Sequence, residues 1–451
     1  MERERQQDQD YVLRSVEERG VRYIQLWFTD VLGIRRGFSI TPAELEIALD
    51  EGMTFDGSAV DGFSRVQEAD VLAVPDARTF QVHPWRDVGG TDLPVARIFC
   101  DVVNLDGTPF EGDPRQVLRR QLTRARELGF SFFAAPEIEY FYFAAGDAGD
   151  RLEPLDHGSY FEMTVNDVGA ELRRRTVLTL EDLGIPVEYS QHEDAPSQHE
   201  IDLRYTDALS MSDTIMTVRH VVQELALERG VRATFMPKPM EGVQGSGMHT
   251  HFSLFDGKGN AFHDASDTYG LSAVAKGFIA GLLAHAREIT AVTNQWVNSY
   301  KRLVVGYEAP VYVSWARNNR SAIVNVPHFK HNRVESTRIE YRAPDPACNP
   351  YLTFAVVLAA GLRGIEKGYE LPPETAANLY AMTAAEREAA GIESLPSNLG
   401  EAVDEMARSE LVADALGDHV FEWFIRNKRD EWADYKTHVS RWELRRYLPT
   451  L

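Results

Sequence analysis

Four glutamates in two short stretches of the sequence have the spacing of metal ligands. Glu137 and Glu139 lie two positions apart in the aromatic-rich segment 135–141, and strand alternation would project both from one face. Glu193 and Glu200 stand on either side of a tight, proline-containing turn. Carboxylate oxygens are the ligands that hard divalent cations require. Each pair alone also fits a solvated strand face or an exposed loop, so only their combination predicts a cation site.

A glycine-rich loop that leads into a strand adds imidazole groups to this set. In Gly-Ser-Gly-Met-His-Thr-His at 245–251, His249 and His251 share one face of the predicted strand. A single histidine in such a place is about as often a hydrogen-bonded core residue as a ligand. The glycines allow the backbone to approach a small ligand closely.

The region from 298 to 342 carries the densest set of ionisable groups. Alternation over its last five residues puts Arg338, Glu340 and Arg342 on one strand face, a pattern that also suits a surface charge ladder. Arginines hold phosphoryl and carboxylate oxygens with paired donors and stabilise the charge that develops in phosphoryl transfer. The other charged residues of interest in this region are Lys301, Arg302, Glu308, Arg317 and Arg320.

The N-terminal part of the chain, which must support these segments, predicts a small α+β domain. Its strand-like runs and its capped helix start lie at 23–28, 95–103 and 41–45. Turn-forming residues at 106–109, followed by a new helix, mark the end of this unit. We therefore expect domains at 8–106 and 107–451.

The larger domain alternates helical and strand-like segments, which again indicates an α+β architecture. A helix is predicted at 116–128, and the chain from Leu399 onward is helical and amphipathic. The segments 144–157 and 371–398 have the composition of loops. The strands that carry most of the glutamates are predicted at 130–143, 200–203 and 339–341.

Composition excludes several classes of protein. Lys and Arg number 47 against 69 for Asp and Glu, and the formal charge of -22 repels nucleic acid and anionic membrane surfaces. Cys100 and Cys348 lie far apart and form no paired-thiol motif, as in proteins of reducing compartments. The N-terminus is polar, and the apolar stretch at 353–362 has roughly half of the ~20 residues that span a bilayer. We expect a cytoplasmic protein without nucleic-acid or membrane partners.

Long motifs occur in a fixed order along the whole chain. They are Leu-Trp-Phe-Thr-Asp at 26–30, Phe-Asp-Gly-Ser at 55–58, Pro-Glu-Ile-Glu at 136–139, Gly-Ser-Gly-Met-His at 245–249, Asn-Ser-Tyr-Lys-Arg at 298–302, Gly-Tyr-Glu-Ala-Pro at 306–310, Arg-Asn-Asn-Arg-Ser at 317–321, Arg-Ile-Glu-Tyr-Arg at 338–342, Asn-Pro-Tyr at 349–351 and Trp-Glu-Leu at 442–444. This series resembles glutamine synthetase of the bacterial type I class, a glutamate-amine ligase family. The resemblance implies a small N-terminal β-grasp domain, then a large catalytic domain with a curved antiparallel sheet and surrounding helices. It also implies a homododecamer of two stacked rings, with active sites between subunits.

The same resemblance implies a two-step ligase reaction that depends on two metal ions. ATP would phosphorylate the side-chain carboxylate of glutamate, and ammonium would displace phosphate from γ-glutamyl phosphate to give glutamine. One Mg²⁺ or Mn²⁺ ion would be held by Glu139, Glu193 and Glu200. The other ion would be held by Glu137, His249 and Glu340.

Further residues take roles by similarity to the family. Arg302 would hold the substrate carboxylate in a pocket shaped by Gly245, and Glu308 would lie on a loop that shields the intermediate and accepts a proton. Arg320 and Arg342 would assist phosphoryl transfer. The nucleotide would lie near His251, Ser253, Arg320 and Arg338. The ammonium pocket would comprise Tyr160, Glu193 and a neighbouring subunit's Asp56, which takes the first proton.

A few positions depart from the family pattern. Ala59 stands where a serine is usual in the ammonium pocket, and Gln244 stands where an asparagine is usual. These two changes keep open a γ-glutamyl ligase that uses a larger amine, such as a polyamine or ethanolamine. Asn325 replaces an arginine near the nucleotide phosphates, and the residues after Tyr380 do not fit an adenylylation site. A catalytically inactive relative that serves only in assembly is the third hypothesis, which the retained ligand set disfavours.

Overall fold

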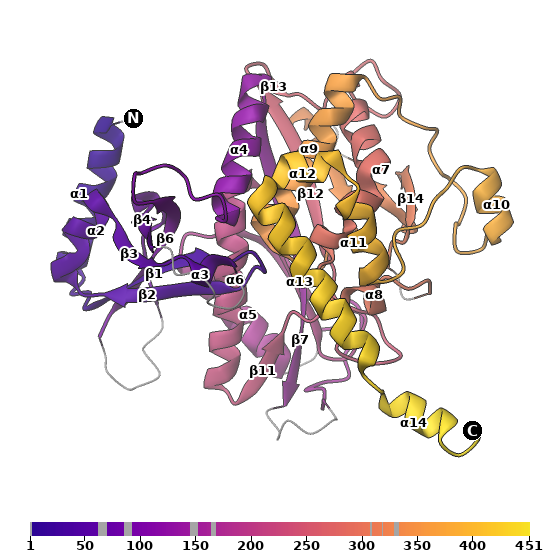
Figure 1. Ribbon diagram of the computed structural model, residues 1–451, viewed down its shortest axis with the longest axis horizontal. Coiled ribbons are helices and arrows are strands. Elements are labelled where there is room, and N and C mark those ends of the chain that lie inside the picture. Colours follow the sequence, from indigo (N-terminus) through magenta and orange to yellow (C-terminus); the bar gives the residue numbers. More distant parts are fainter. Residues whose placement is uncertain are drawn as a thin grey trace.

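Two β-sheets and their helices make up the part of the chain that the structure describes (Figure 1). The structure is a computed structural model that describes residues 2–61, 70–84, 93–144, 152–163, 168–306, 309–317, 319–328 and 333–451. Within these ranges, no helix has both the length and the apolar character that a membrane crossing requires.

The N-terminal sheet is mixed and is covered by short helices. Its strands are β1 (Tyr23–Thr29), β2 (Arg35–Ile40), β3 (Met53–Asp56), β4 (Asp70–Pro75), β5 (Gln81–Val82) and β6 (Val95–Asn104). The helical elements are α1 (Glu2–Glu18), η1 (Pro42–Glu44), α2 (Leu45–Glu51), α3 (Ser58–Asp61) and η2 (Ala77–Thr79). The order across the sheet is β2-β1-β6-β4-β3, and β1 runs parallel to β6. Val12, Leu26 and Ile98 are fully buried in its core, which confirms the α+β reading and the strands predicted at 23–28 and 95–103.

The larger sheet has ten strands and supports the predicted site. They are β7 (Ser131–Ala144), β8 (Val187–His192), β9 (Gln198–Leu203), β10 (Thr206–Asp207), β11 (Val231–Thr234), β12 (Met248–Asp256), β13 (Gly259–Asn260), β14 (Tyr312–Ala316), β15 (Ala322–Asn325) and β16 (Ile339–Tyr341). The central order is β14-β15-β16-β12-β7-β9-β8. The expected antiparallel sheet needs one correction, because β14 and β15 pair in parallel. Tyr312 pairs with Ala322, and Trp315 pairs with Val324.

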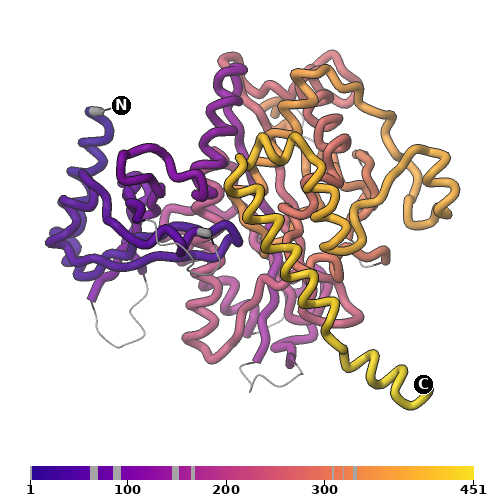
Figure 2. Tube along the Cα trace, viewed as in Figure 1, coloured from indigo at the N-terminus to yellow at the C-terminus, as the bar shows by residue number. Residues whose placement is uncertain are grey.

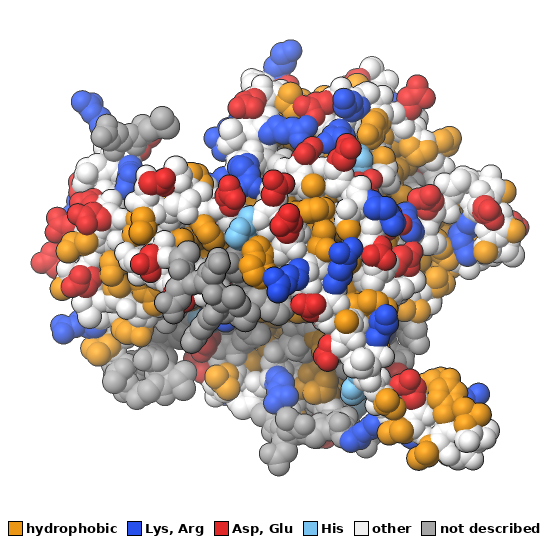
Figure 3. All heavy atoms as spheres, viewed as in Figure 1, with side chains coloured by type: hydrophobic (Ala, Val, Ile, Leu, Met, Phe, Trp, Pro, Cys, Tyr) orange, Lys and Arg blue, Asp and Glu red, His pale blue; other side chains and the backbone are white. Residues whose placement is uncertain are grey.

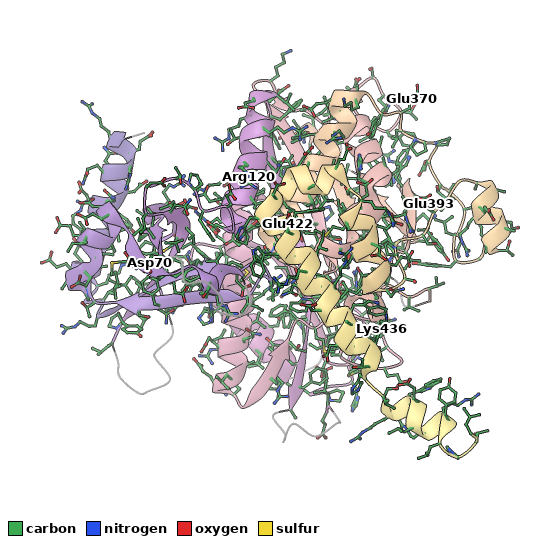
Figure 4. The ribbon with its side chains drawn as sticks, viewed as in Figure 1. Asp70, Arg120, Glu370, Glu393, Glu422 and Lys436 are labelled. Atoms are coloured by element: carbon green, nitrogen blue, oxygen red, sulfur yellow. The ribbon has the colours of Figure 1, made fainter. Side chains whose placement is uncertain are left out.

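Helices surround this sheet (Figure 1). They are α4 (Pro114–Glu127), α5 (Val168–Asp182), α6 (Ala208–Glu228), α7 (Ala273–Thr293), α8 (Ser299–Arg302), η3 (Val334–Ser336), α9 (Pro350–Lys367), α10 (Ala384–Ala389), α11 (Leu399–Ala407), α12 (Glu410–Leu416), α13 (Asp418–Thr437) and α14 (Arg441–Tyr447). The apolar stretch at 353–362 lies in α9, which packs closely on α7. Gly281 and Gly364 allow this close packing, since a side chain at either position would clash with the backbone of the other helix. Helix α9 is a core helix, as predicted. In Figure 4, Arg120 of α4 lies beside the C-terminal helices, where its guanidinium donates to the Leu416 carbonyl oxygen at 2.7 Å.

Buried charge pairs join the two sheets. Arg115 of α4 lies 3.0 Å from the Asp76 carboxylate on the N-terminal side and 2.9 Å from the Asp213 carboxylate of α6. Arg97 of β6 donates to the Thr217 hydroxyl of α6 at 2.9 Å. The boundary between residues 106 and 107 stays a prediction. Figure 2 shows the two chain ends at opposite sides of the molecule, with α14 projecting from the body.

Candidate active site

Strand pairing brings the predicted ligands from distant segments onto one face of the large sheet. Residues that lie directly opposite each other in an antiparallel ladder project to the same side. The opposing pairs are Glu139 and Glu200 between β7 and β9, Glu137 and His249 between β7 and β12, and His251 and Glu340 between β12 and β16. Four adjacent strands therefore present carboxylate and imidazole groups together.

A cavity of about 460 Å³ opens over this face. Its lining includes all the predicted metal ligands, which are Glu137, Glu139, Glu193, Glu200, His249 and Glu340. It also includes the predicted substrate and phosphoryl contacts Tyr160, Gly245, Arg302, Arg320 and Arg342. The fold thus gathers residues between 137 and 342 into one polar, concave site.

One group in this cavity has the arrangement of a metal site. The ligand atoms of Glu137, His249 and Glu340 lie within 4.8 Å of one another. Asn325 Nδ2 donates to Glu340 Oε2 at 2.6 Å, and His251 Nε2 lies 2.8 Å from Glu137 Oε1, so one oxygen of each carboxylate is held from behind. Burial lowers the pKa of His249, which favours the neutral imidazole that metals bind. The group fits a divalent cation.

A second carboxylate group lies at the β7–β9 side of the cavity. Burial and the charge of Glu193 raise the pKa of Glu139 to about 8. Burial and neighbouring carboxylates raise the pKa of Glu200 well above its ordinary value. Gln191 Nε2 donates to Glu193 Oε1 and to Glu200 Oε1, both at 2.9 Å, and so ties these two side chains together. Carboxylates that repel one another in a buried site fit a cation, which would compensate their charge.

Arg302 brings a buried positive charge to the cavity wall. Its guanidinium donates to the Ala343 carbonyl oxygen at 2.7 Å and to the Arg342 carbonyl oxygen at 3.2 Å. The glycine loop packs directly on it, since a Cβ atom added to Gly247 would lie 2.6 Å from Arg302 Nη2. The adjacent Gly245 carbonyl accepts a hydrogen bond from Gln198 Nε2 at 3.1 Å. A fixed guanidinium beside a close-approaching backbone suits a small carboxylate substrate.

Three further arginines line the cavity. Arg342 Nε lies 3.2 Å from Glu340 Oε1, and Arg342 Nη1 donates to the Arg320 carbonyl oxygen. Arg317 and Arg320 also line the cavity. Asn325, which departs from the family pattern, donates to the Glu340 carboxylate. The cavity therefore holds cationic groups next to the predicted metal site, as phosphoryl transfer requires.

Three of the four predicted nucleotide residues, His251, Ser253 and Arg338, line a second cavity of about 510 Å³, whereas the fourth, Arg320, lines the first. Glu137 and Tyr189 line both cavities, so the two meet there. Arg338 Nε lies 3.3 Å from His251 Nδ1. The residues predicted to bind the substrate and most of those predicted to bind the nucleotide thus line two adjoining cavities.

Sequence reasoning missed three residues of this second cavity. The rings of Tyr205 and Phe255 are nearly parallel, with centroids 6.4 Å apart and an interplanar angle of 6°. Phe255 stands two positions after Ser253 on the same strand face, a signal that was available. Asp202, two positions after Glu200, lies opposite Glu137, and burial together with the charge of Glu137 raises its pKa to about 7.

Other predicted residues lie elsewhere. Asp56 belongs to β3 of the N-terminal sheet and is not among the described residues that line either cavity. Ala59 lies in α3 of the same region. Glu308 lies outside the residues that the structure describes. Gln244 lines the first cavity, and its amide donates to the carboxylate of Asp194.

Comparison with known proteins agrees with this geometry. Residues 20–105 match the family described as "Glutamine synthetase, beta-Grasp domain", and residues 111–447 match "Glutamine synthetase, catalytic domain". A glutamine synthetase of Mycolicibacterium smegmatis is 56% identical over 440 residues, which cover 97% of this chain and 98% of that protein. The glutamine synthetase of Thermotoga maritima is 47% identical over 438 residues, with the same coverage of 97% and 98%.

Solved structures agree as well. A structure named "GmaS/ADP complex-Conformation 1" has a TM-score of 0.87 and 32% identity, covering 97% of this chain and 99% of that one. A second, named "Apo GmaS without ligand", has a TM-score of 0.83 and 33% identity, covering 96% and 98%. Fold, site and motifs agree over nearly the full length, and the chain therefore belongs to the glutamine synthetase family.

Proposed function

We propose that this protein is a glutamate-ammonia ligase that makes glutamine, using ATP and a γ-glutamyl phosphate intermediate. The observation that carries the proposal is the junction of two cavities at Glu137. One cavity has the guanidinium groups and carboxylates that a dicarboxylate substrate and cations require, and the other has aromatic walls that suit a nucleotide base. At their junction a terminal phosphoryl group would meet a substrate carboxylate.

Two divalent cations, Mg²⁺ or Mn²⁺, complete the site in this proposal. Glu139, Glu193 and Glu200 hold one ion, and the group with Glu137, His249 and Glu340 holds the other. Bound cations supply charge neutralisation for the transferring phosphoryl oxygens. Gln191 and Asn325 keep ligand carboxylates oriented by donating to them.

The remaining groups position the two substrates. Arg302, fixed by three backbone carbonyls, binds the glutamate carboxylate, and the Gly245 loop packs against this arginine. Arg320 and Arg342 stabilise the negative charge of the moving phosphoryl group. ATP lies in the second cavity near Ser253 and Arg338. The similar GmaS structure that is a complex with ADP supports a nucleotide site in this fold.

The ammonium pocket takes shape only when subunits assemble. Tyr160 and Glu193 line the cavity, whereas Asp56 lies in the N-terminal sheet of the same chain, so a neighbouring subunit's Asp56 would complete the pocket. Figure 3 shows hydrophobic side chains gathered on the projecting C-terminal helix, as expected of a contact between subunits. They are Val439, Trp442, Leu444, Tyr447 and Leu448. We propose the homododecamer of the family.

We also propose that the protein is located in the cytoplasm. Cys100 and Cys348 are both buried free thiols, which suits a reducing compartment. The surplus of acidic residues disfavours nucleic acid and anionic membranes as partners.

The proposal is tested by measuring phosphate release from ATP with glutamate and Mg²⁺. Ammonium is the expected co-substrate, and putrescine, spermidine and ethanolamine serve as alternatives in separate reactions. Turnover with ammonium and formation of glutamine would support the proposal. Turnover with an organic amine but none with ammonium would overturn it in favour of a larger-amine ligase, which the names of the relatives do not favour.

A further inference from the structure

Asp156 is the centre of a hydrogen-bond group that joins two segments of the cavity wall. We define the Asp156 cluster as Asp156, His192 and His199. Asp156 Oδ1 lies 2.8 Å from His192 Nε2, and Asp156 Oδ2 lies 3.5 Å from His199 Nε2. The same Oδ1 atom accepts from the backbone N–H groups of Gly158 at 2.9 Å and Ser197 at 3.0 Å. One carboxylate therefore ties the segment 152–163 to the turn between β8 and β9.

Two histidines and a carboxylate also resemble a metal site, since their ligand atoms lie within 4.8 Å of one another. The proton positions argue against this reading. Arg173 can only donate, so its contact with His199 Nδ1 places the proton of that ring on Nε2, toward Asp156. His192 Nδ1 lies 2.6 Å from the Glu193 carbonyl oxygen, and its Nε2 faces the Asp156 carboxylate. Both Nε2 atoms thus face the Asp156 carboxylate, and both Nδ1 atoms contact other groups, so the protein itself already holds the two rings.

The backbone around the Asp156 cluster is tightly constrained. Among the described residues, positive φ angles outside glycine occur at Phe161 and Ser197, both at 59°. Ser197 Oγ accepts from the Asp156 N–H at 2.9 Å, and the Phe161 N–H donates to the His192 carbonyl at 3.0 Å. A Cβ atom on Gly158 would lie 2.5 Å from His192 Nε2, so this backbone rests directly on the imidazole. Left-handed residues cost free energy and persist where their surroundings hold them.

The two segments that the cluster joins carry the two cavity residues of the amine pocket. Tyr160 directly precedes the left-handed Phe161, and Glu193 directly follows His192. We propose that Asp156 is a positioning residue that fixes Tyr160 relative to Glu193 and thereby sets the affinity for the amine. This inference rests on the proposed function and adds a residue that touches neither substrate. Asp156 acts through its contacts with the His192 ring and the Ser197 turn.

The test is Asp156→Asn, which keeps the shape and removes the charge opposite His192. We expect the KM for ammonium to rise about tenfold, since a small displacement of positioning groups lowers reactivity strongly. The KM for ATP and kcat at saturating ammonium should change by less than about twofold. Asp264→Asn is the matched control, because Asp264 also accepts from a backbone N–H in a turn, that of Ser266, and lines neither cavity. It should leave all three constants unchanged.

A second variant addresses the backbone itself. Phe161→Gly relaxes the left-handed φ angle at an exposed position, where loss of the side chain opens no core cavity. It should raise the KM for ammonium without lowering the melting temperature. Equal changes in all constants, or an unchanged KM for ammonium in both variants, would overturn the inference.

Amide hydrogen exchange separates this inference from the proposed function. Asp156→Asn should accelerate exchange in residues 152–163 and 192–199 together, whether or not ammonium is the true substrate. Acceleration in only one of the two segments would refute the coupling. Failure of wild-type turnover with ammonium, with coupled exchange intact, would refute the proposed function and leave the positioning role to be assigned to another amine.

Discussion

Glu139 shows what the fold imposes on a single carboxylate. Its Oε2 atom accepts from Gln198 Nε2 at 2.8 Å and from the Gly247 N–H at 2.9 Å, yet burial and Glu193 raise its pKa from 4.5 to about 8. At a pH between these two pKa values, Glu139 is protonated in the metal-free folded state but has lost its proton in the unfolded chain. The free energy of unfolding must therefore fall as the pH rises through this window.

We predict that the metal-free protein loses thermal stability between pH 6 and pH 8, by up to about 1.4 kcal/mol per pH unit for one such group. Mg²⁺ should restore the loss by compensating the carboxylates. Glu139→Gln should flatten the pH dependence and reduce the Mg²⁺ effect, because the amide carries no charge to compensate. Melting curves across pH, with and without Mg²⁺, measure both; a variant that keeps the wild-type slope would contradict the assignment.

At the same scale, Glu340→Ala should reduce phosphoryl transfer by about 10³-fold, since a ligand is lost and Arg342 no longer has its carboxylate partner. Phosphate release with glutamate, ATP and Mg²⁺ is the measurement. Glu127→Ala, at an exposed site near the end of α4, is the matched control and should retain wild-type turnover. An unchanged rate in Glu340→Ala would refute the metal role of this residue.

At the scale of elements, β12 and its preceding glycine loop organise both cavities. The strand sets His249 opposite Glu137 and His251 opposite Glu340, while the loop presses on the Arg302 guanidinium. Arg302 can lie this close to the loop only because Gly247 has no side chain, so the addition of a single methyl group should disturb the contact.

Gly247→Ala should therefore displace Arg302 and raise the KM for glutamate by about tenfold or more. The added Cβ atom would lie 2.6 Å from Arg302 Nη2 and 3.1 Å from His249 Nε2. Gly257→Ala is the control, because a Cβ atom there meets nothing within 4 Å. Steady-state kinetics with glutamate as the varied substrate would decide; equal KM values for the two variants would argue that Arg302 does not hold the substrate.

The C-terminal helix is a second element with a separable role. Trp442 and Leu448 are 56% and 78% exposed, although such side chains are normally buried. Deletion of residues 438–451 should leave the fold intact and dissociate the assembly into smaller species. Light scattering after size exclusion measures the mass, with circular dichroism as the check on folding; an unchanged mass would remove α14 from the interface.

At the scale of the whole molecule, the two sheets meet around an aromatic cluster. The Trp27 ring centroid lies 5.8 Å from that of His83 and 5.0 Å from that of His220. Burial and the charges of Arg97 and Arg35 lower the pKa of His83 to about 3, and burial lowers the pKa of His220 likewise. Glu224 lies 3.6 Å from His220 Nδ1.

Since both folded-state pKa values lie below the ordinary 6.5, the unfolded chain binds more protons at acidic pH, and stability falls as the pH drops below about 6.5. For each histidine, we expect the free energy of unfolding to fall by up to about 1.4 kcal/mol per pH unit of acidification. His83→Gln combined with His220→Gln should flatten the acid limb of stability measured by urea unfolding between pH 7 and pH 5. A limb that stays as steep would place the acid sensitivity elsewhere.

Residue types and their spacing predicted the kind of chemistry in the candidate site and most of the local structure. Strand alternation placed Glu137 with Glu139, and Arg338, Glu340 and Arg342, on common faces, because side chains along a strand alternate whatever the strand pairs with. The turn residues and apolar periodicity likewise predicted β1, β6, α4 and β16 close to their observed bounds.

Which strand faces lie next to each other could be seen only in the folded structure. Pairing of β7 with both β9 and β12 depends on packing between residues far apart in the chain, so no local spacing could place Glu139 opposite Glu200. The same holds for Tyr205 beside Phe255, for Asn325 bound to Glu340, and for Asp156 between His192 and Ser197. These contacts join segments whose separation along the sequence carries no periodic signal, and their energies appear only once the sheet has formed.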